Sequence, residues 1–522
     1  MKKIITLFSL TFITTTNAQT IFQKTFGGTN ADWGNAALVL TDGRFMIAGS
    51  TSSVGAGNYD FYLIQLDANG DTLCTKTYGG AQNDICTALR QTSDGGYVMV
   101  GNSETVTAGG TDVCLVRTDS SGNLLWAKNY GGAEADEGFG VQQTTDGGFI
   151  VCGNTLSISS DLTSDIFLIK TDALGDTMWT REFTGIFDDF GYSVVQADDG
   201  GYLVTGTTNS FGPGVYDFCA VKTNANGLYQ WSRTYGHFGL EYSYTMIKVT
   251  SGGYAIAGHT SSFGAGDVDV CLLRIDNGGN MLWAKTYGRD DSDVPNFLSE
   301  TADGGFAIAG YTQDVSAGNT NFFLVRTDSS GNMLWSKSYG GSNNDEAYSV
   351  RETADGGYLM VGHSYSFGAG SVDLYIVKTD SIGNSGCNQT TPATVAGTAG
   401  LQTLGFPVNI QFGASVFSPT FTTGGGSTFT NPCIPTGNDD IENEHYSSSI
   451  FPNPASEEFT IYNLRFTISK IEIYNMIGKK VLEHQTSDIE HRTVSIADFT
   501  PGIYFVRVYG DDNTAVFKLI KE

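Results

Sequence analysis

The sequence predicts an all-β protein: a seven-bladed β-propeller closed by its N-terminal strand, followed by a small C-terminal β-sandwich. Three observations predict this fold. A glycine turn recurs seven times at a spacing of 52 or 53 residues, each repeat holds four strand-like runs, and the chain before the first repeat supplies a strand that the last repeat lacks. A period of about 50 residues with four strands is typical of a propeller blade.

The turn that marks each repeat is Asp-Gly-Gly or a close variant. Its seven copies begin at Asp42, Asp94, Asp146, Asp199, Ser251, Asp303 and Asp355. In the second repeat the four strand-like runs cover residues 85–92, 97–101, 113–118 and 124–132, with Gly, Asp and Asn between them. Short apolar or alternating runs separated by these residue types are strands joined by tight turns.

The order of the strands favours a closed ring over an open solenoid. A strand of the type that ends in Tyr-Gly-Gly occurs at 22–28, before the first complete repeat, and the last repeat stops near 383–386 without one. Pairing the first strand with the last repeat would remove the exposed edges of the sheets. A solenoid would instead need polar caps at its two ends.

The repeats resemble those of seven-bladed propellers in secreted bacterial proteins. The resemblance is carried by Asp-x-x-Leu-Val-Arg-Thr-Asp-Ser-x-Gly-Asn at 112–123, by the Trp and Tyr-Gly-Gly that follow, and by the Asp-Gly-Gly turn. It covers about residues 20–386, so we assign the propeller to 19–386. It implies the fold but little about activity, because propellers include enzymes, lectins and scaffolds.

The first 18 residues predict a signal peptide. Met1-Lys2-Lys3 precedes an apolar run from Ile4 to Thr15 and the small residues that end at Ala18. This pattern places the mature N-terminus at Gln19. The apolar run is shorter than the ~20 residues that cross a bilayer, and no later run is long and apolar enough to do so. We expect a soluble protein outside the cytoplasm with no membrane span.

The composition argues against nucleic-acid binding. Asp and Glu number 55 against 28 Lys and Arg, which gives a net charge of −27. Such a surface repels phosphate backbones. The chain also contains 67 Gly, 25 Tyr and 32 Phe, a composition that indicates turn-rich β-structure with an aromatic core rather than disorder.

A change in composition marks the end of the propeller. Residues 388–432 contain no Asp, Glu, Lys or Arg and are rich in Thr, Gly, Ser and Pro, with some strand-like alternation of Thr and Phe. We therefore predict a linker at 387–445. Cys387 and Cys433 bracket this segment, and in an oxidising compartment we expect them to form a disulfide.

The other six cysteines do not indicate a metal site. Cys114, Cys219 and Cys271 occupy a repeat position that is Tyr or Phe in other copies, so we expect them in the core, together with Cys152. The sequence leaves a Cys74–Cys86 disulfide open. No Cys/His spacing has the form of a metal site.

The C-terminal residues 446–522 resemble the type A sorting domain of the type IX secretion system. The motifs that carry this resemblance are Phe-Pro-Asn-Pro-Ala at 451–455 and the strand-like runs 459–462, 471–481, 499–508 and 517–522. Alternating strands with Gly and Pro turns predict a small β-sandwich. The resemblance implies a Bacteroidota-like bacterium, contact with the type IX secretion machinery through this domain, and export to the cell surface or beyond. The domain would then be cut off near the acidic hinge at 437–445.

Acidic residues recur at equivalent positions of the repeats and allow two interpretations. As rings of carboxylates they could bind Ca²⁺. As turn and strand-end residues they would bond backbone amides, which is what every blade needs in order to fold. We prefer the structural interpretation because a functional site breaks the symmetry that these residues express, and we predict no cofactor. The two principal rings are Asp32, Asp84, Asp136, Asp189, Glu241, Asp293 and Asp345, and Asp60, Asp112, Asp165, Asp217, Asp269 and Asp373 with Asn321 in the sixth copy.

Asymmetry between repeats is the better indication of a binding site. The residue after the glycine of the second strand varies, and the long loops beside it are rich in Ser, Gly and aromatic residues, which suits contact with a ligand. Ordinary variation at exposed positions is the alternative explanation. The candidate ligand-binding residues at this position are Asn102, Asn154, Thr207, His259, Tyr311 and His363.

No catalytic residue can be nominated from the sequence. The chain has six His and lacks Gly-x-Ser-x-Gly, a zinc pair and a nucleotide-binding loop. We therefore predict a secreted or cell-surface binding or structural protein, not an enzyme, whose ligand is an extracellular glycan or a surface protein. The alternative is a propeller hydrolase that acts on polysaccharide and carries a pair of acids at the channel mouth.

Overall fold

The computed structural model describes residues 19–107, 109–158, 163–314, 319–405, 409–411, 415–417, 422–424, 428–430, 449–451, 457–462, 470–475, 479–485, 492–509 and 514–521. The chain divides into two compact units, Met1–Pro435 and Thr436–Glu522, which we treat separately. The predicted signal peptide lies outside the described residues. Every regular element among them is a strand, which confirms the all-β prediction, and none is a helix that could cross a membrane.

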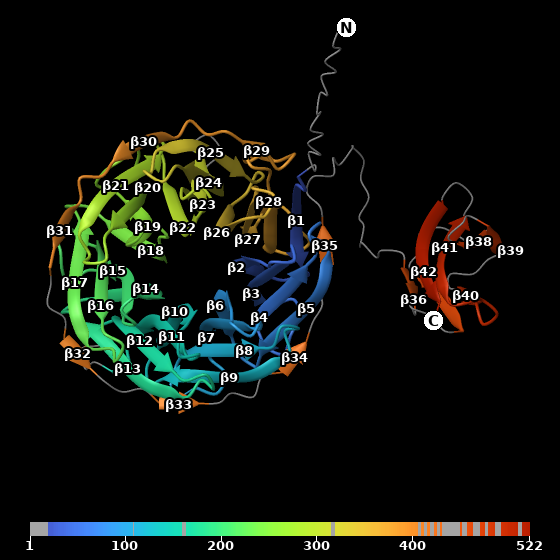
Figure 1. Ribbon diagram of the computed structural model, residues 1–522, viewed down its shortest axis with the longest axis horizontal. Helices are drawn as coiled ribbons and strands as arrows, with labels where there is room; N and C mark the ends of the chain where they lie inside the picture. Colours follow the sequence, from blue (N-terminus) through green and yellow to red (C-terminus); the bar gives the residue numbers. More distant parts are fainter. Residues whose placement is uncertain are drawn as a thin grey trace, which may run out of the picture. The chain divides into compact units, whose positions relative to one another are not determined.

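The first unit contains seven sheets arranged around a central opening (Figure 1). Each sheet has five strands and is antiparallel throughout. The strand nearest the opening is the first of each repeat, and we call these seven the inner strands. They are β2 (Asp32–Val39), β6 (Asp84–Gln91), β10 (Asp136–Gln143), β14 (Asp189–Gln196), β18 (Glu241–Lys248), β22 (Asp293–Glu300) and β26 (Asp345–Glu352).

Three further strands of each repeat follow outward from the inner strand. The second strands are β3 (Phe45–Thr51), β7 (Tyr97–Ser103), β11 (Phe149–Thr155), β15 (Tyr202–Thr208), β19 (Tyr254–Thr260), β23 (Phe306–Asp314) and β27 (Tyr358–Ser364). The third strands are β4 (Asp60–Leu66), β8 (Asp112–Thr118), β12 (Asp165–Thr171), β16 (Asp217–Thr223), β20 (Asp269–Ile275), β24 (Asn319–Thr327) and β28 (Asp373–Lys378). The fourth strands are β5 (Thr72–Gly79), β9 (Leu124–Gly131), β13 (Thr177–Thr184), β17 (Tyr229–Gly236), β21 (Met281–Gly288), β25 (Met333–Tyr339) and, from the N-terminal end, β1 (Phe22–Gly27).

Strand β1 belongs to the sheet that contains the last repeat. It pairs antiparallel with β28, and the register places Phe22 opposite Lys378 and Phe26 opposite Leu374. The first strand of the chain and the last repeat thus share one sheet, although more than 340 residues separate them along the chain.

The segment after the repeats forms a belt around the outside of the ring. Its seven short strands each add a fifth strand to one sheet, and they visit the sheets in the reverse of chain order, from β25 back to β5 and then β1. Figure 1 shows them in orange on the perimeter. The belt strands are β29 (Gln389–Thr390), β30 (Val395–Thr398), β31 (Gln402–Leu404), β32 (Asn409–Gln411), β33 (Ser415–Phe417), β34 (Thr422–Gly424) and β35 (Thr428–Thr430).

The belt begins beside a disulfide. Cys387 is disulfide-bonded, while Cys433, its predicted partner, lies outside the described residues. Cys74, Cys86, Cys114, Cys152, Cys219 and Cys271 are free, so Cys74 and Cys86 do not pair. Cys114, Cys152, Cys219 and Cys271 are buried in the apolar core, as the sequence predicts.

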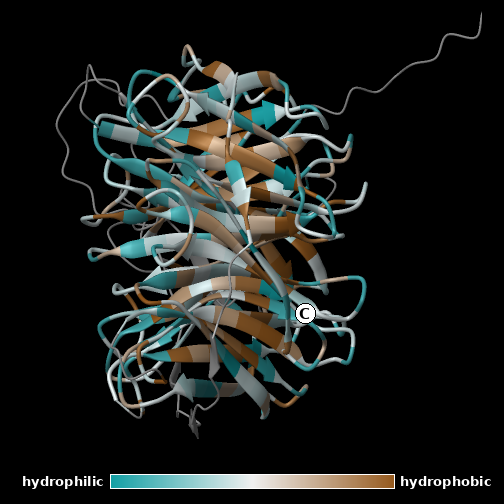
Figure 2. Cartoon of the chain, turned by 90° about the vertical axis from the view of Figure 1, so that its left-hand side faces the viewer, coloured by the Kyte–Doolittle hydropathy of each residue, from teal (hydrophilic) through white to brown (hydrophobic). Residues whose placement is uncertain are grey.

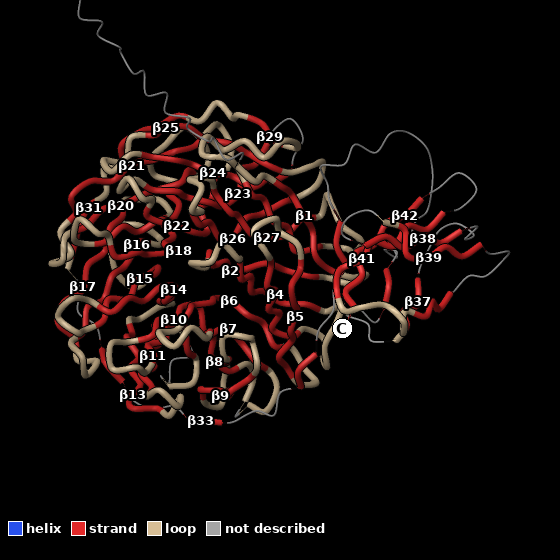
Figure 3. The backbone as a smooth tube through the Cα atoms, turned by 45° about the vertical axis from the view of Figure 1, so that its right-hand side comes forward, coloured by secondary structure: helices blue, strands red, loops and turns tan. Residues whose placement is uncertain are grey.

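Apolar side chains fill the spaces between neighbouring sheets. Each core cluster takes residues from two adjacent sheets, as in the cluster that joins Phe61 and Tyr78 to Leu89 and Met99. In the edge-on view the brown, hydrophobic segments lie along the strands, and the loops gather at the two faces of the ring (Figure 2). Figure 3 shows the strands in red and the loops that join them in tan. The ring is therefore held together by contacts between sheets as well as within them.

Buried tyrosine hydroxyls add hydrogen bonds between adjacent sheets. In five sheets a fourth-strand tyrosine donates to the carbonyl of a turn glycine in the next sheet, over 2.5–2.7 Å; these tyrosines are Tyr78, Tyr130, Tyr235, Tyr287 and Tyr339. The hydroxyl would be costly to bury without a partner. The bond therefore fixes each sheet against its neighbour.

Buried acids lie close together at the junctions between sheets. Asp217 is fully buried, and its Oδ2 accepts the N–H of Gly214 at 3.0 Å. Burial, with the neighbouring charge of Glu241, raises its pKa to about 7. Gly236 fits against this carboxyl because it has no side chain: a Cβ there would lie 1.4 Å from Oδ1. In the sixth repeat Asn321 takes the equivalent place beside Gly340.

Replacing Asp217 with Asn is expected to stabilise the protein at pH 8 and to have little effect at pH 3. The folded-state pKa lies above the unfolded value, so the folded state loses stability as the pH rises from the unfolded pKa of about 4 to the folded pKa of about 7. An amide cannot ionise. We expect the Tm to rise by about 2 °C or more at pH 8, measured by thermal melts at both pH values. The control is Asp290→Asn at an exposed position, and equal melting curves for Asp217→Asn and wild type at pH 8 would refute the argument.

The second unit consists of two antiparallel sheets with a common apolar core. Their orders are β36-β37-β40 and β39-β38-β41-β42. Ile461 and Val494 of the first sheet pack with Ile471 and Val506 of the second. The strands are β36 (Ser449–Phe451), β37 (Glu458–Tyr462), β38 (Lys470–Asn475), β39 (Lys480–Gln485), β40 (Arg492–Ser495), β41 (Gly502–Tyr509) and β42 (Thr514–Lys521).

Candidate functional site

A β-bulge interrupts each of the seven inner strands at the same position. The register between inner and second strand skips one residue, always the third after the acid that begins the strand. A bulge bends a strand and redirects a side chain. The seven bulged residues are Asn35, Thr87, Phe139, Tyr192, Tyr244, Asn296 and Tyr348.

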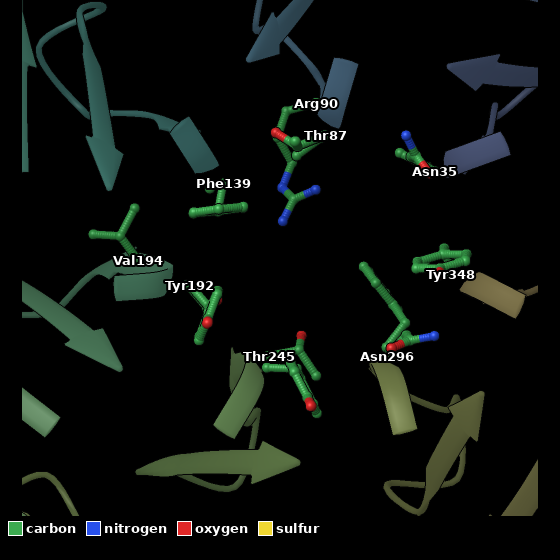
Figure 4. Close-up of a pocket in the computed structure, with 15 residues that line it drawn as sticks. Asn35, Thr87, Arg90, Phe139, Tyr192, Val194, Thr245, Asn296 and Tyr348 are labelled. Carbon is green, nitrogen blue, oxygen red and sulfur yellow. The ribbon is translucent and has the colours of Figure 1, made fainter. Parts of the chain in front are cut away.

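All seven bulged residues line one cavity in the central opening. Its volume is about 330 Å³, and each of the seven side chains is partly exposed to it. Figure 4 shows side chains from the inner strands surrounding this cavity, with the guanidinium of Arg90 pointing toward its middle. A second cavity of about 440 Å³ shares Arg90, Val194, Thr245 and Phe297 with the first, so the two are continuous parts of one channel.

Aromatic side chains occupy one side of this channel. Phe139 and Tyr192 meet edge to face with ring centroids 5.2 Å apart, and Tyr244 follows 5.9 Å from Tyr192. These residues come from β10, β14 and β18, three neighbouring inner strands. We call Phe139, Tyr192 and Tyr244 the aromatic arc. Burial raises the pKa of both tyrosine hydroxyls, so they remain neutral donors.

The polar bulged residues hold their neighbours in place. Asn35 and Asn296 donate from Nδ2 to the carbonyls of Cys86 and Ala347, at 2.6 and 2.9 Å. Thr87 donates to the carbonyl of Gly138 at 2.7 Å. Each accepting residue lies on the next inner strand, directly before its bulged residue. One bulge therefore positions the next around the ring.

Three sequence-predicted ligand residues turn out to position the bulges. Oδ1 of Asn102 and of Asn154 accepts the backbone N–H of Gly138 and of Gly191, each at 2.8 Å. The hydroxyl of Thr207 accepts the N–H of Ser243 at 3.0 Å and is fully buried. The donors directly precede Phe139, Tyr192 and Tyr244. These side chains support the aromatic arc from behind.

The other three predicted residues lie beside the channel tyrosines. His259 Nδ1 is 3.2 Å from the hydroxyl of Tyr244, and the His363 ring lies 5.4 Å from that of Tyr348. Tyr311 lies near both Tyr244 and Tyr348. Asn102, Asn154 and Thr207 each accept the backbone N–H of the residue before a bulge. His259 cannot do the same, because the residue before Asn296 is Pro295, which has no N–H. Burial lowers the pKa of both histidines to about 4, so they are neutral at physiological pH.

The acids that begin the inner strands take part in structural hydrogen bonds. Asp84, for example, is buried and accepts from the N–H of Gly80 at 2.7 Å and from the Thr105 hydroxyl at 3.0 Å. All seven acids of this ring are buried. In the part of the chain that the structure describes, no three His, Cys, Asp or Glu residues are grouped so that they could hold a metal ion.

Sequence reasoning alone did not identify the bulged residues. The signal available was their variation, Asn, Thr, Phe, Tyr, Tyr, Asn, Tyr, at a fixed distance from a repeated acid. The same variation occurs at the position after the second-strand glycine. Only the register of the strands reveals which of the two positions faces the channel.

Two protein-family models match parts of the chain. Residues 449–522 match the family described as a secretion system C-terminal sorting domain, and residues 40–72 match a β-propeller domain of unknown function. The chain therefore carries a propeller and a type IX sorting domain. This domain indicates contact with the type IX secretion system and export to the cell surface or the extracellular space, consistent with an origin in Bacteroidota.

Two curated proteins share parts of the sequence. The regulatory protein FlaEY of Caulobacter vibrioides is 24% identical over 302 residues, which is 52% of this chain and 29% of that protein. An ulvan lyase of Nonlabens ulvanivorans is 30% identical over 67 residues, 13% of this chain and 12% of the lyase. The chain thus spans less than a third of either relative.

Solved structures with some similarity include an endo-1,5-α-L-arabinanase from Thermotoga petrophila. It covers 67% of this chain at 9% identity, over all of its own length, with a TM-score of 0.26. The extracellular domain of a hybrid two-component system from B. thetaiotaomicron covers 96% of this chain and all of its own, at 7% identity and a TM-score of 0.17.

Proposed function

We propose that this chain is an exported seven-bladed propeller, closed by β1, that binds an extracellular glycan in its central channel. One observation carries the proposal: seven bulges direct side chains of four different types into a single cavity. A scaffold would need only the symmetric features of the repeats. Bulges that aim variable side chains at one place are typical of functional sites.

The chemistry of the channel suits a sugar. The aromatic arc offers flat apolar faces against which the C–H face of a sugar ring can pack, and the tyrosine hydroxyls and asparagine amides offer hydrogen bonds for its hydroxyls. A few convergent polar groups among aromatic residues are the common composition of a ligand pocket. The volume of about 330 Å³ accommodates one or two sugar residues.

Binding accounts for the channel better than hydrolysis of a polysaccharide does. Glycoside hydrolysis generally uses two carboxyl groups on either side of the scissile bond. The described residues that line the two cavities include no Asp or Glu. Glu137 and Glu346 on the inner strands lie two residues before Phe139 and Tyr348, and burial raises the pKa of both.

Truncating the aromatic arc should abolish glycan binding. We expect Tyr192→Ala and Tyr244→Ala each to weaken binding by about tenfold or more, because each removes a stacking face. The measurement is a glycan array probed with the full chain, followed by titration calorimetry on the best glycan. Tyr229→Ala, on an outer strand, is the matched control and should bind normally.

Two results would count against this assignment. If wild type binds no glycan, the channel has another use. If Tyr229→Ala loses as much affinity as the arc variants, binding occurs elsewhere on the protein. An assay for new reducing ends on the same glycan separates binding from hydrolysis, and we expect none to form.

A further inference from the structure

Two arginines reach into the channel of a strongly acidic protein. Arg90 lies on β6 and Arg351 on β26, with β2 between these strands in the ring. Arg90 lines both cavities, and Arg351 lines the second. The equivalent positions of the other inner strands hold no cation; they are Leu38, Gln142, Val195, Ile247 and Ser299. The pair of arginines therefore breaks the repeat symmetry at one side of the channel.

Neither arginine has a carboxylate partner within the described residues. Arg90 donates to the carbonyl of Leu89 at 2.9 Å, and Arg351 to that of Val350 at 3.4 Å. Several other partly buried cations of this protein are paired with a carboxylate: Arg117 with Asp94 at 2.5 Å, for example, and Lys222 with Asp199 at 2.8 Å. Arg90 and Arg351 thus place two positive charges in the channel without such a partner.

This arrangement is unfavourable for the folded protein by itself. Burial, together with the like charge of Arg90, lowers the pKa of Arg351 to about 9. Burial also lowers the pKa of Arg90. Two partly buried guanidinium groups without a counter-charge are unfavourable. Both remain charged at physiological pH, and an anion placed between them would remove this penalty.

Packing explains part of the arrangement but not all of it. The Arg351 guanidinium lies over the Phe297 ring, 4.4 Å from its centroid, which is a favourable cation–π contact. Such a contact would hold the guanidinium flat with its edge toward the channel. The cation–π contact explains the position of Arg351 only, since Arg90 has no such contact among those described. A negatively charged ligand would explain why both arginines lie in the channel.

We propose, on the basis of the proposed glycan-binding function, that the ligand is an anionic sugar chain whose carboxylate or sulfate groups are bound by Arg90 and Arg351. Guanidinium groups bind both kinds of oxyanion through paired hydrogen bonds. The aromatic arc begins on β10, the inner strand next to β6 and Arg90, and would stack the sugar rings. Because the whole protein carries a net charge of −27, a long polyanion is repelled by its surface. The channel therefore takes a short oligosaccharide or the end of a chain.

The test compares ligands that differ only in charge. Calorimetric titrations of the full chain would use an α-1,4-linked galacturonate hexamer and its fully methyl-esterified form, and a dextran sulfate oligomer and plain dextran of the same length. We expect one anionic member of these pairs to bind at least about tenfold more tightly than its neutral form. A difference within the galacturonate pair would indicate a carboxylate ligand, and a difference within the dextran pair would indicate a sulfate ligand.

Variants then assign the preference to the arginines. Arg90→Gln and Arg351→Gln should each reduce the affinity for the anionic sugar by about tenfold or more and leave the neutral form unaffected. Arg44→Gln is the matched control: it removes the same charge from a guanidinium that already pairs with Asp42 at 2.6 Å and lines neither cavity. Thermal melts check the fold, and if Arg351→Gln does not fold, Arg90→Gln together with Arg351→Lys decides.

The outcomes separate this inference from the proposed function. If neutral and charged sugars bind equally, or if the arginine variants keep the preference, the arginine assignment is wrong while glycan binding in the channel stands. If no sugar of either charge binds and the array is also empty, both proposals fail.

Discussion

Removal of the belt, β29–β35, is expected to make the propeller aggregate. The belt strands pair with the outermost strand of every sheet, including β1. Without them, seven strands present unpaired N–H and C=O groups to solvent, which is the situation that leads sheets to associate edge to edge. The apolar side chains of Ala399 and Leu401, buried in the core cluster of β17 and β21, would also be lost.

The comparison requires two chains that differ only in the belt. The first ends at residue 435 and the second at residue 388, and both carry Cys387→Ser so that the disulfide does not differ. We expect the longer chain to be monomeric and the shorter one to associate as its concentration increases, measured by light scattering, with a lower Tm. A shorter chain that stays monomeric at the same concentrations with an unchanged Tm would show that the belt is dispensable.

The architecture of the repeats could be predicted because every copy contains the same local signals. Asp-Gly-Gly turns and short apolar runs recur at a constant spacing, so the four strands of one repeat predict those of the others. The pairing of β1 with β28 also accords with the missing strand in the last repeat. Turn chemistry and period are local properties, and the sequence displays them directly.

The belt could not be predicted in the same way. Its strands are two to four residues long, too short for a period to be recognised, and their pairing partners lie at least 50 residues away along the chain. The composition indicated only a Thr/Gly/Ser-rich segment with some strand character. What makes it a belt is the row of unpaired outer edges that the folded ring offers, which is a property of the tertiary structure.

The channel was missed for a related reason. In a regular strand, side chains alternate between two faces, but a bulge shifts this alternation by one residue. The side chains of Thr87 and Tyr192 therefore point where the sequence pattern alone would not place them. The predicted residues nevertheless lie next to the site, since Asn154 and His259 contact the backbone or the hydroxyl of channel residues.

Filling the channel should abolish binding without removing any aromatic contact. Thr87 has the smallest of the seven bulged side chains and lies in the cavity of about 330 Å³. The substitution Thr87→Trp would place an indole in the space that we assign to the sugar. Thr87→Val controls for the lost hydrogen bond to Gly138, and Thr72→Trp, at an exposed position of β5, controls for the added indole.

The most direct test of the channel as the ligand site is a glycan array probed in parallel with wild type and Thr87→Trp. The predicted result is that wild type binds at least one glycan, that Thr87→Trp binds none, and that both control variants bind as wild type does. Undiminished binding by a folded Thr87→Trp protein would contradict the account and place the ligand outside the channel.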